Sequence, residues 1–201
     1  EKLNCKVDVL YLIREILGRI EIEKKILNSD IIYVGGGNTL KMMTIWRRLG
    51  VDKIMQKALE KNIVLCGLSA GSICWFKYGN SDSRKFTSAS KKLIKVSGLG
   101  FINALHCPHY DVEPHRKKNL KRMMKNSSLV SIAIENDCAI QIEDGKYRII
   151  TSNRKAEAYK VYWKNGKLFE EKLKKNSYFL SLNNLLSKWL KLQKYEKFWN
   201  N

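Results

Sequence analysis

The stretch Ile63-Val64-Leu65-Cys66-Gly67-Leu68-Ser69-Ala70-Gly71 decides the predicted fold. Residues 63–66 are apolar and partly β-branched, a pattern typical of a buried strand. The strand leads directly into Gly67-Leu68-Ser69-Ala70-Gly71, which has the Gly-x-Ser-x-Gly spacing of a sharp strand-to-helix turn. Such a turn presents the serine hydroxyl at the end of a sheet, and its glycines let other chain segments approach. The stretch therefore predicts an α/β fold with a candidate nucleophile at Ser69.

A second strand-loop-helix unit precedes this one. Residues 31–34 are apolar and lead into Gly35-Gly36-Gly37-Asn38-Thr39, and helical patterns follow over residues 40–49 and 51–60. Alternating strands and helices with continuous apolar strands predict a mostly parallel, doubly wound sheet. Towards the C-terminus, Asp144-Gly145 and Asn165-Gly166 each separate two short apolar runs, so we expect antiparallel hairpins there.

Other segments complete the predicted organisation. We expect a strand over residues 7–13, a helix over residues 72–78 after Ser69, and a polar loop over residues 79–92. An apolar stripe on a basic background predicts a C-terminal helix over residues 182–198. The predicted domains are one α/β domain, 1–175, and a basic amphipathic extension, 176–201, packed on it.

Two backbone regions could stabilise an oxyanion beside Ser69. The amide of Ala70 follows the nucleophile at a helix N-terminus, where backbone N–H groups are free. The amide of Gly36 or Gly37 would form the second wall, because consecutive glycines allow backbone amides to face a ligand. A tight packing turn is the alternative for each loop.

A serine nucleophile needs a base and a group that orients the base. His109 follows Pro108 at the end of a predicted strand, where functional residues of α/β sheets gather, whereas His106 is expected to be structural. The third member should be a carboxylate, and the spacing leaves three alternatives open: Asp82, Asp111 and Glu113.

Composition excludes several classes of protein. The net charge is +19, from 38 Lys and Arg against 19 Asp and Glu. Most of these cations are Lys and they spread along the chain, so we expect a solvated basic surface and no nucleic-acid partner. No apolar run approaches the length of a membrane span. The five cysteines form no Cys-x-x-Cys pair, which favours a reducing compartment, the cytoplasm, and no metal.

The motifs GGGNT (35–39), GLSAGS (67–72) and PHY (108–110), in this order, resemble the peptidase family S51 of dipeptidase E and cyanophycinase, and most closely its bacterial peptidase E-like branch. The resemblance implies a class I glutamine amidotransferase-like (flavodoxin-like) fold and a serine peptidase without a cofactor. It implies Ser69 as nucleophile, His109 as base and Asp82 as acid. Gly36 or Gly37 with Ala70 would form the oxyanion hole.

The resemblance also implies a substrate. Dipeptidases of this family prefer an N-terminal Asp, so Arg116 would bind an acidic short peptide, with Asn38 as a further substrate-binding residue. A homodimer is a further expectation. Members of the family begin with another strand and helix before Val7, so we expect this chain to lack that unit. The alternative function is a non-catalytic or degenerate member that binds anions or nucleic acid.

Overall fold

A computed structural model describes residues 4–14, 17–88, 90, 92–112 and 114–188. The chain divides into two compact units, Glu1–Pro108 and His109–Asn201, and each is described by itself. In the described part of the chain, no helix is both long and apolar enough to cross a membrane.

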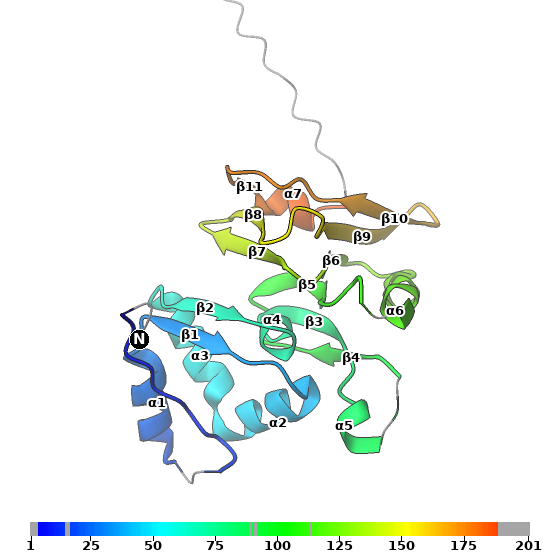
Figure 1. Ribbon diagram of the computed structural model, residues 1–201. Helices are drawn as coiled ribbons and strands as arrows, with labels where there is room; N and C mark the ends of the chain where they lie inside the picture. Colours follow the sequence, from blue (N-terminus) through cyan, green and yellow to red (C-terminus); the bar gives the residue numbers. More distant parts are fainter. Residues whose placement is uncertain (1–3, 15–16, 89, 91, 113, 189–201) are drawn as a thin grey trace, which may run out of the picture. The chain divides into compact units, whose positions relative to one another are not determined.

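The first half of unit 1 contains the two strands that carry the glycine loops (Figure 1). β1 and β2 pair in parallel, with Val34 opposite Gly67, so both loops leave the same end of this sheet. Helices α1 and α3 pack on each other, and Figure 1 shows them on one side of the two strands. The elements are α1 (Arg19–Leu27), β1 (Ile31–Val34), α2 (Thr39–Leu49), α3 (Val51–Glu60), β2 (Val64–Gly67) and α4 (Ala70–Ile73).

Local sequence explains the boundaries of α2 and α3. Asn38 caps α2, because its side chain accepts a hydrogen bond from the backbone N–H of Lys41. Gly50 ends α2 with a left-handed φ of 72°, a conformation that glycine adopts without steric cost. One face of α3 is buried: Val51, Ile54, Met55 and Ala58.

The rest of unit 1 forms a second sheet. β3 lies between β4, which is antiparallel to it, and β5, which is parallel to it. These elements are β3 (Phe76–Ser81), α5 (Lys85–Ser88), β4 (Ile94–Ser97) and β5 (Ile102–Cys107).

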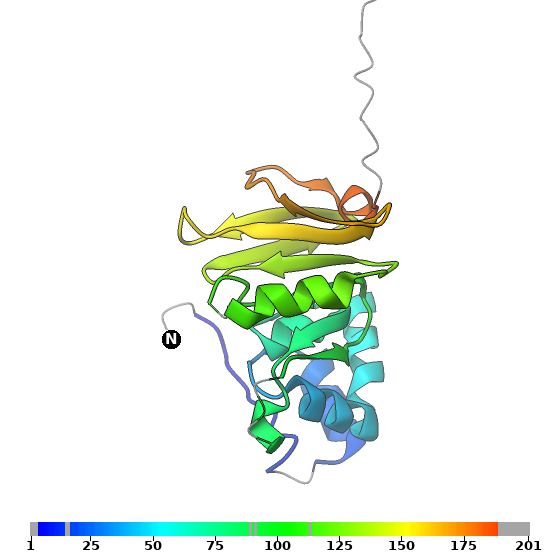
Figure 2. The same ribbon diagram turned by 90° about the vertical axis from the view of Figure 1, so that its right-hand side faces the viewer.

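Unit 2 is built mainly from antiparallel strands. β6, β9 and β10 are neighbours in one sheet, with α6 packed against β9 (Figure 2), and β7, β8 and β11 form another. The elements are α6 (Pro114–Met124), β6 (Val130–Ile134), β7 (Cys138–Glu143), β8 (Lys146–Thr151), β9 (Ala158–Lys164), β10 (Lys167–Lys172), β11 (Leu180–Ser181) and α7 (Leu182–Leu186). Both predicted hairpin turns are confirmed: Asp144, Gly145, Asn165 and Gly166 all have positive φ, as a type I′ turn requires.

The predicted fold class, α/β with parallel strands first and antiparallel hairpins later, is confirmed, but three local predictions are wrong. Residues 7–13 form no strand, and Figure 1 draws them as coil beside α1. The helix predicted over residues 72–78 ends at Ile73, since β3 begins at Phe76 and pairs with β4 and β5. The predicted loop 79–92 contains the end of β3 and α5. A fourth prediction is right only at its start: α7 begins at Leu182 as predicted but ends at Leu186, and positions 189–198 of the predicted helix lie outside the described residues.

Candidate active site

Ser69 occupies a strained turn between β2 and α4. Its backbone angles are φ 56° and ψ −112°, a region that residues other than glycine rarely adopt. Strain of this kind costs of the order of 1–3 kcal/mol and persists only where the surrounding structure enforces it, as at functional sites. Ser69 therefore has the backbone geometry of a serine nucleophile on a sharp turn.

The glycines around Ser69 are required by close packing. A Cβ atom at Gly71 would lie 1.9 Å from the carbonyl oxygen of Val34, and one at Gly67 would lie 2.4 Å from the carbonyl oxygen of Gly71. Both distances are far inside van der Waals contact, so only glycine fits at either position. The end of β1 is thus in close backbone contact with the turn that carries Ser69.

The glycine loop after β1 lies against Ser69. A Cβ atom at Gly36 would be 3.4 Å from the Cβ of Ser69, and Gly37 has a φ of 140°, which favours glycine. Ala70 is the first residue of α4 and is buried. The structure therefore brings together Gly36, Ser69 and Ala70, while the oxyanion role of the amides stays a prediction.

The buried His106 contacts the turn at Ser69 through the hydroxyl of Ser72. The hydroxyl of Ser72 donates a hydrogen bond to the carbonyl of Ser69 at 2.8 Å, and it lies 3.0 Å from Nε2 of His106. Because the hydroxyl proton is already used, Nε2 of His106 must be the donor. His106 is 2% exposed and stacks on Phe76 at 4.5 Å between ring centroids. This histidine has the structural role predicted for it, since its Nε2 holds a proton and cannot accept one from Ser72.

His109 lies in unit 2 and has its own polar partner. Its Nδ1 is 2.7 Å from Oδ1 of Asn136, and its φ is 54°. An amide oxygen can only accept, so Nδ1 carries the proton and Nε2 keeps a lone pair, the tautomer that a general base needs. Asp111, one of the alternative acids, accepts the backbone N–H of Asn136 at 3.0 Å. Glu113 lies outside the described residues.

The sequence analysis missed Asn136. A signal was present, since Asn136 follows the buried strand β6 closely, as Gly35 follows β1. Polar residues just after buried strands are candidates for the functional edge of an α/β sheet. The expected partner of His109 was a carboxylate, whereas the observed partner is the amide oxygen of Asn136.

The other predicted residues make contacts of their own. Asp82 forms an ion pair with Lys85 in unit 1. Asn38, besides capping α2, donates from Nδ2 to the carbonyl of Ser83 at 3.3 Å. Arg116 lies on α6 in unit 2 and is 2% exposed. The catalytic role of Asp82 and the substrate-binding roles of Asn38 and Arg116 stay predictions.

Burial raises the pKa of three cysteine thiols and so lowers their reactivity as nucleophiles. It raises the pKa of Cys66, just before the turn, and that of Cys74, just after it. Burial also raises the pKa of Cys138 to about 11. These thiols stay protonated at neutral pH, and the thiol form is a poor nucleophile. The described residues also contain no group of three or more His, Cys, Asp or Glu side chains placed to hold a metal ion.

A cavity of about 450 Å³ opens beside the glycine loop in unit 1. Its lining includes Gly36, Gly37 and Ala70, the residues whose amides are the predicted oxyanion donors. A segment from Leu10 to Arg14 and one face of α2 complete it. The predicted oxyanion donors thus border a space large enough for a small substrate group.

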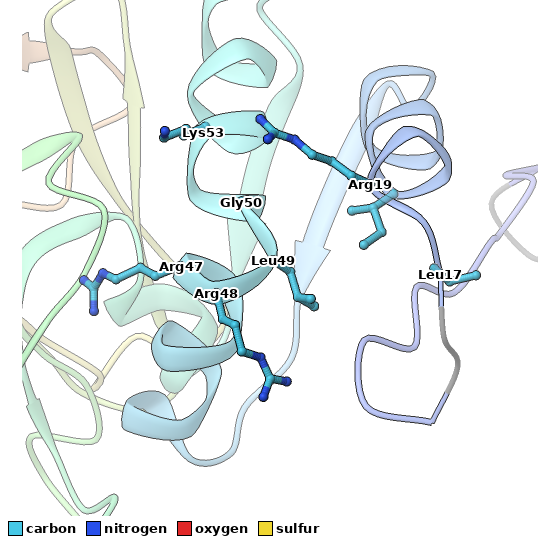
Figure 3. A pocket seen from close by; sticks show the side chains of 8 residues that line it. Leu17, Arg19, Arg47, Arg48, Leu49, Gly50 and Lys53 are labelled. Carbon is cyan, nitrogen blue, oxygen red and sulfur yellow. The ribbon is translucent and has the colours of Figure 1, made fainter.

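A second cavity, of about 400 Å³, lies at the junction of α2 and α3 (Figure 3). Four cations line it: Arg19, Arg47, Arg48 and Lys53. Arg19 packs over Gly50, and Arg47 donates to the backbone carbonyls of Ser97 and Gly98. Figure 3 shows Arg47 and Arg48 pointing in different directions, so these cations do not converge on one point.

Comparisons with known proteins agree with this geometry. The chain is 36% identical over 138 residues to the uncharacterized peptidase YgaJ of Bacillus subtilis (strain 168), a match that covers 68% of this chain and 57% of that protein. It is 28% identical over 120 residues to the uncharacterized peptidase Lmo0363 of Listeria monocytogenes, covering 58% of this chain and 57% of that protein. The chain thus spans a little over half the length of these relatives.

Solved structures share the fold. A crystal structure assigned to a peptidase E protein of Listeria monocytogenes EGD-e superposes with a TM-score of 0.53 at 22% identity, covering 86% of this chain and 73% of that one. A peptidase from an acI-B1 Actinobacterium gives a TM-score of 0.54 at 12% identity, covering 82% and 64%. The sequence model of peptidase family S51 matches residues 1–150. The motifs at the two glycine loops and the strained serine in the loop after β2 agree with this match, and the chain belongs to peptidase family S51.

Proposed function

We propose that the chain is a serine peptidase of the peptidase E type that hydrolyses short peptides. Ser69 Oγ attacks the peptide carbonyl carbon, and its proton passes to Nε2 of His109. The C–N bond then breaks, and the leaving amine takes that proton. Water, deprotonated by the same imidazole, cleaves the acyl-enzyme and releases the acid product and Ser69.

The observation that carries this proposal is the backbone conformation of Ser69, with φ 56° and ψ −112°. Gly36 packs against Ser69, and helix α4 begins at the next residue, Ala70. Amides of Gly36 or Gly37 and of Ala70 would donate to the oxyanion, where one preorganised donor is typically worth about 3 kcal/mol of barrier lowering.

We further propose that Asn136, rather than Asp82, orients the imidazole of His109. The 2.7 Å contact to Nδ1 supports this assignment, and Asp82 pairs with Lys85 instead. A neutral amide fixes the tautomer but stabilises the imidazolium less than a carboxylate would. Asn136→Asp should therefore keep or raise the rate of peptide hydrolysis, while Asn136→Leu should lower it by tenfold or more. An unchanged rate in Asn136→Leu would exclude the role.

The test of the function is labelling by a small fluorophosphonate followed by peptide mapping. Label should appear on Ser69, and Ser69→Ala should abolish both labelling and dipeptide hydrolysis. The exposed Ser152 offers a matched control, since Ser152→Ala should change neither. Hydrolysis that stays within twofold of the parent in Ser69→Ala would refute the proposal.

For the substrate, we propose a short peptide with an N-terminal Asp, in a reducing, cytoplasmic setting. Support comes from the family resemblance and from the excess of cations. A set of dipeptides that differ only in the first residue tests this directly. Equal rates for Asp, Asn and Ala at that position would exclude a preference for Asp.

The second candidate function is anion binding without catalysis. The cations that line the cavity at the α2–α3 junction favour it, although they do not converge on one point, so they would attract a polyanion rather than hold a single small anion. Such a protein should bind a nucleic acid oligomer with an affinity that falls steeply as salt rises. Binding that is absent at low salt, together with labelled Ser69, would leave the peptidase as the better description.

A further inference from the structure

The cavity beside the glycine loop joins two kinds of surface to the oxyanion wall. Met42 and Ile45 on α2 give it an apolar side. Lys41 and Arg14 add two cations, and both residues are exposed. Within residues 4–14 and the other described ranges, neither cation pairs with a carboxylate, and none of the described residues that line this space is acidic. The cavity is therefore amphipathic, and its described charged residues are both positive.

The charge decides which end of a peptide this space accepts. A short peptide has an ammonium group at one end and a carboxylate at the other. The N-terminal residue would bring its ammonium group toward Lys41 and Arg14, which repel it. The C-terminal residue would bring its carboxylate toward them, with its side chain against the apolar wall.

We infer that this cavity binds the C-terminal residue of a short peptide, and that it selects an apolar side chain together with a free α-carboxylate. The inference rests on the proposed function, because it takes Ser69 as the nucleophile that fixes the position of the scissile carbonyl. Gly36 lines the cavity, and a Cβ atom built on it would lie 3.4 Å from the Cβ of Ser69, so the residue after the scissile bond would be close to this space. At about 450 Å³ the cavity has room for a leucine-sized residue and its carboxylate.

Calorimetric titration of the Ser69→Ala variant tests the inference without turnover. The probes are aspartyl-leucine, its C-terminal amide, and aspartyl-lysine, all at low salt, so that each carries the proposed N-terminal residue. Aspartyl-leucine should bind about tenfold more tightly than its amide, because the amide has no charge at its C-terminus for the two cations. Aspartyl-lysine should bind more weakly than aspartyl-leucine, because its side-chain ammonium group faces the same cations.

Substitutions in the cavity locate the effect. Lys41→Ala, on the Ser69→Ala background, should weaken aspartyl-leucine three- to fivefold and leave the amide unchanged, as expected for one partly solvated charge pair. Met42→Ala should weaken aspartyl-leucine but not aspartyl-glycine. Lys61→Ala removes an exposed cation at the end of α3, outside both cavities, and it should change neither affinity.

The inference is overturned if the acid and the amide bind within twofold of each other, or if Lys41→Ala weakens both equally. Failure of all three probes to bind also overturns it. Fluorophosphonate labelling of Ser69 in the parent chain separates this result from a failure of the proposed function. Labelled Ser69 with no carboxylate preference leaves a peptidase whose cavity has another role, whereas unlabelled Ser69 rejects the nucleophile itself.

Discussion

Replacing Ser69 by glycine should stabilise the folded chain relative to replacing it by alanine. Alanine keeps a Cβ atom and therefore keeps the strain of φ 56°, ψ −112°, whereas glycine adopts these angles freely. Both variants lack the hydroxyl, so the comparison removes its chemistry and leaves the backbone. The difference in the free energy of unfolding then reports how much strain the turn stores.

The expected size follows from two opposing contributions. Relief of strain contributes about 1–3 kcal/mol in favour of glycine. The greater freedom of glycine in the unfolded chain costs about 0.4–1 kcal/mol. The Ser69→Gly variant should therefore be about 1 kcal/mol more stable than Ser69→Ala, which corresponds to roughly 2–4 °C in melting temperature for a chain of this size.

Urea denaturation followed by circular dichroism measures this difference, and Ser72 supplies the control. Ser72 lies on helix α4, three residues further on, where glycine is unfavourable. Ser72→Gly should be about 1 kcal/mol less stable than Ser72→Ala, so the sign reverses within one helical turn. If Ser69→Gly proves no more stable than Ser69→Ala, the turn stores no strain and the main support for a nucleophile at this position is lost.

Three further predictions test the surroundings of the turn and unit 2. Gly71→Ala should destabilise the chain by roughly 3 kcal/mol in urea denaturation, because the new Cβ would lie 1.9 Å from the carbonyl oxygen of Val34; a loss below 1 kcal/mol would contradict the packing. His106→Gln keeps a side-chain N–H donor for Ser72 and should retain more fluorophosphonate labelling of the nucleophile than His106→Leu, and equal labelling would argue against a positioning role. Burial raises the pKa of Glu170, but hydrogen bonds from two lysines of α6 outweigh it and leave that pKa below its usual 4.5. The ion pairs therefore add stability above pH 4.5 that is lost as pH falls through the folded pKa, so Glu170→Gln should cost about 0.5–1 kcal/mol at pH 7 and progressively less below pH 4.5. A cost that does not change with pH would contradict this account.

Sequence reasoning succeeded where a structural signal is contained in a few consecutive residues. Gly50 ends α2 because its left-handed φ is a property of one residue. Asn165-Gly166 forms its hairpin turn because two adjacent residues need positive φ. The strands β1 and β2 were found because each is a short apolar run that leads into a glycine-rich loop.

Sequence reasoning failed where pairing with a distant segment decides whether a stretch becomes a strand. Residues 7–13 have the composition of a strand, yet Val7 is 78% exposed and Ile13 is 68% exposed. A strand needs a neighbour for its backbone hydrogen bonds, and composition cannot supply one. The residues after Ile73 were predicted to be helical, but from Phe76 they form β3. Pairing of β3 with β4 and β5 outweighs the local helical pattern.

The candidate residues depend on both kinds of signal. The geometry at Ser69 could be predicted from a local motif, whereas the partner of His109 could not. The geometry at Ser69 is fixed by glycines two residues before and after it, and by the end of one neighbouring strand, so a short motif contains nearly all the necessary information. The orientation of His109 depends on Asn136, which is 27 residues away and belongs to no spacing rule. A base can be oriented by any acceptor that reaches Nδ1, and the chemistry accepts an amide as well as a carboxylate. A motif can therefore locate the candidate nucleophile of such a site, whereas the partner of the candidate base has to be located from the folded chain.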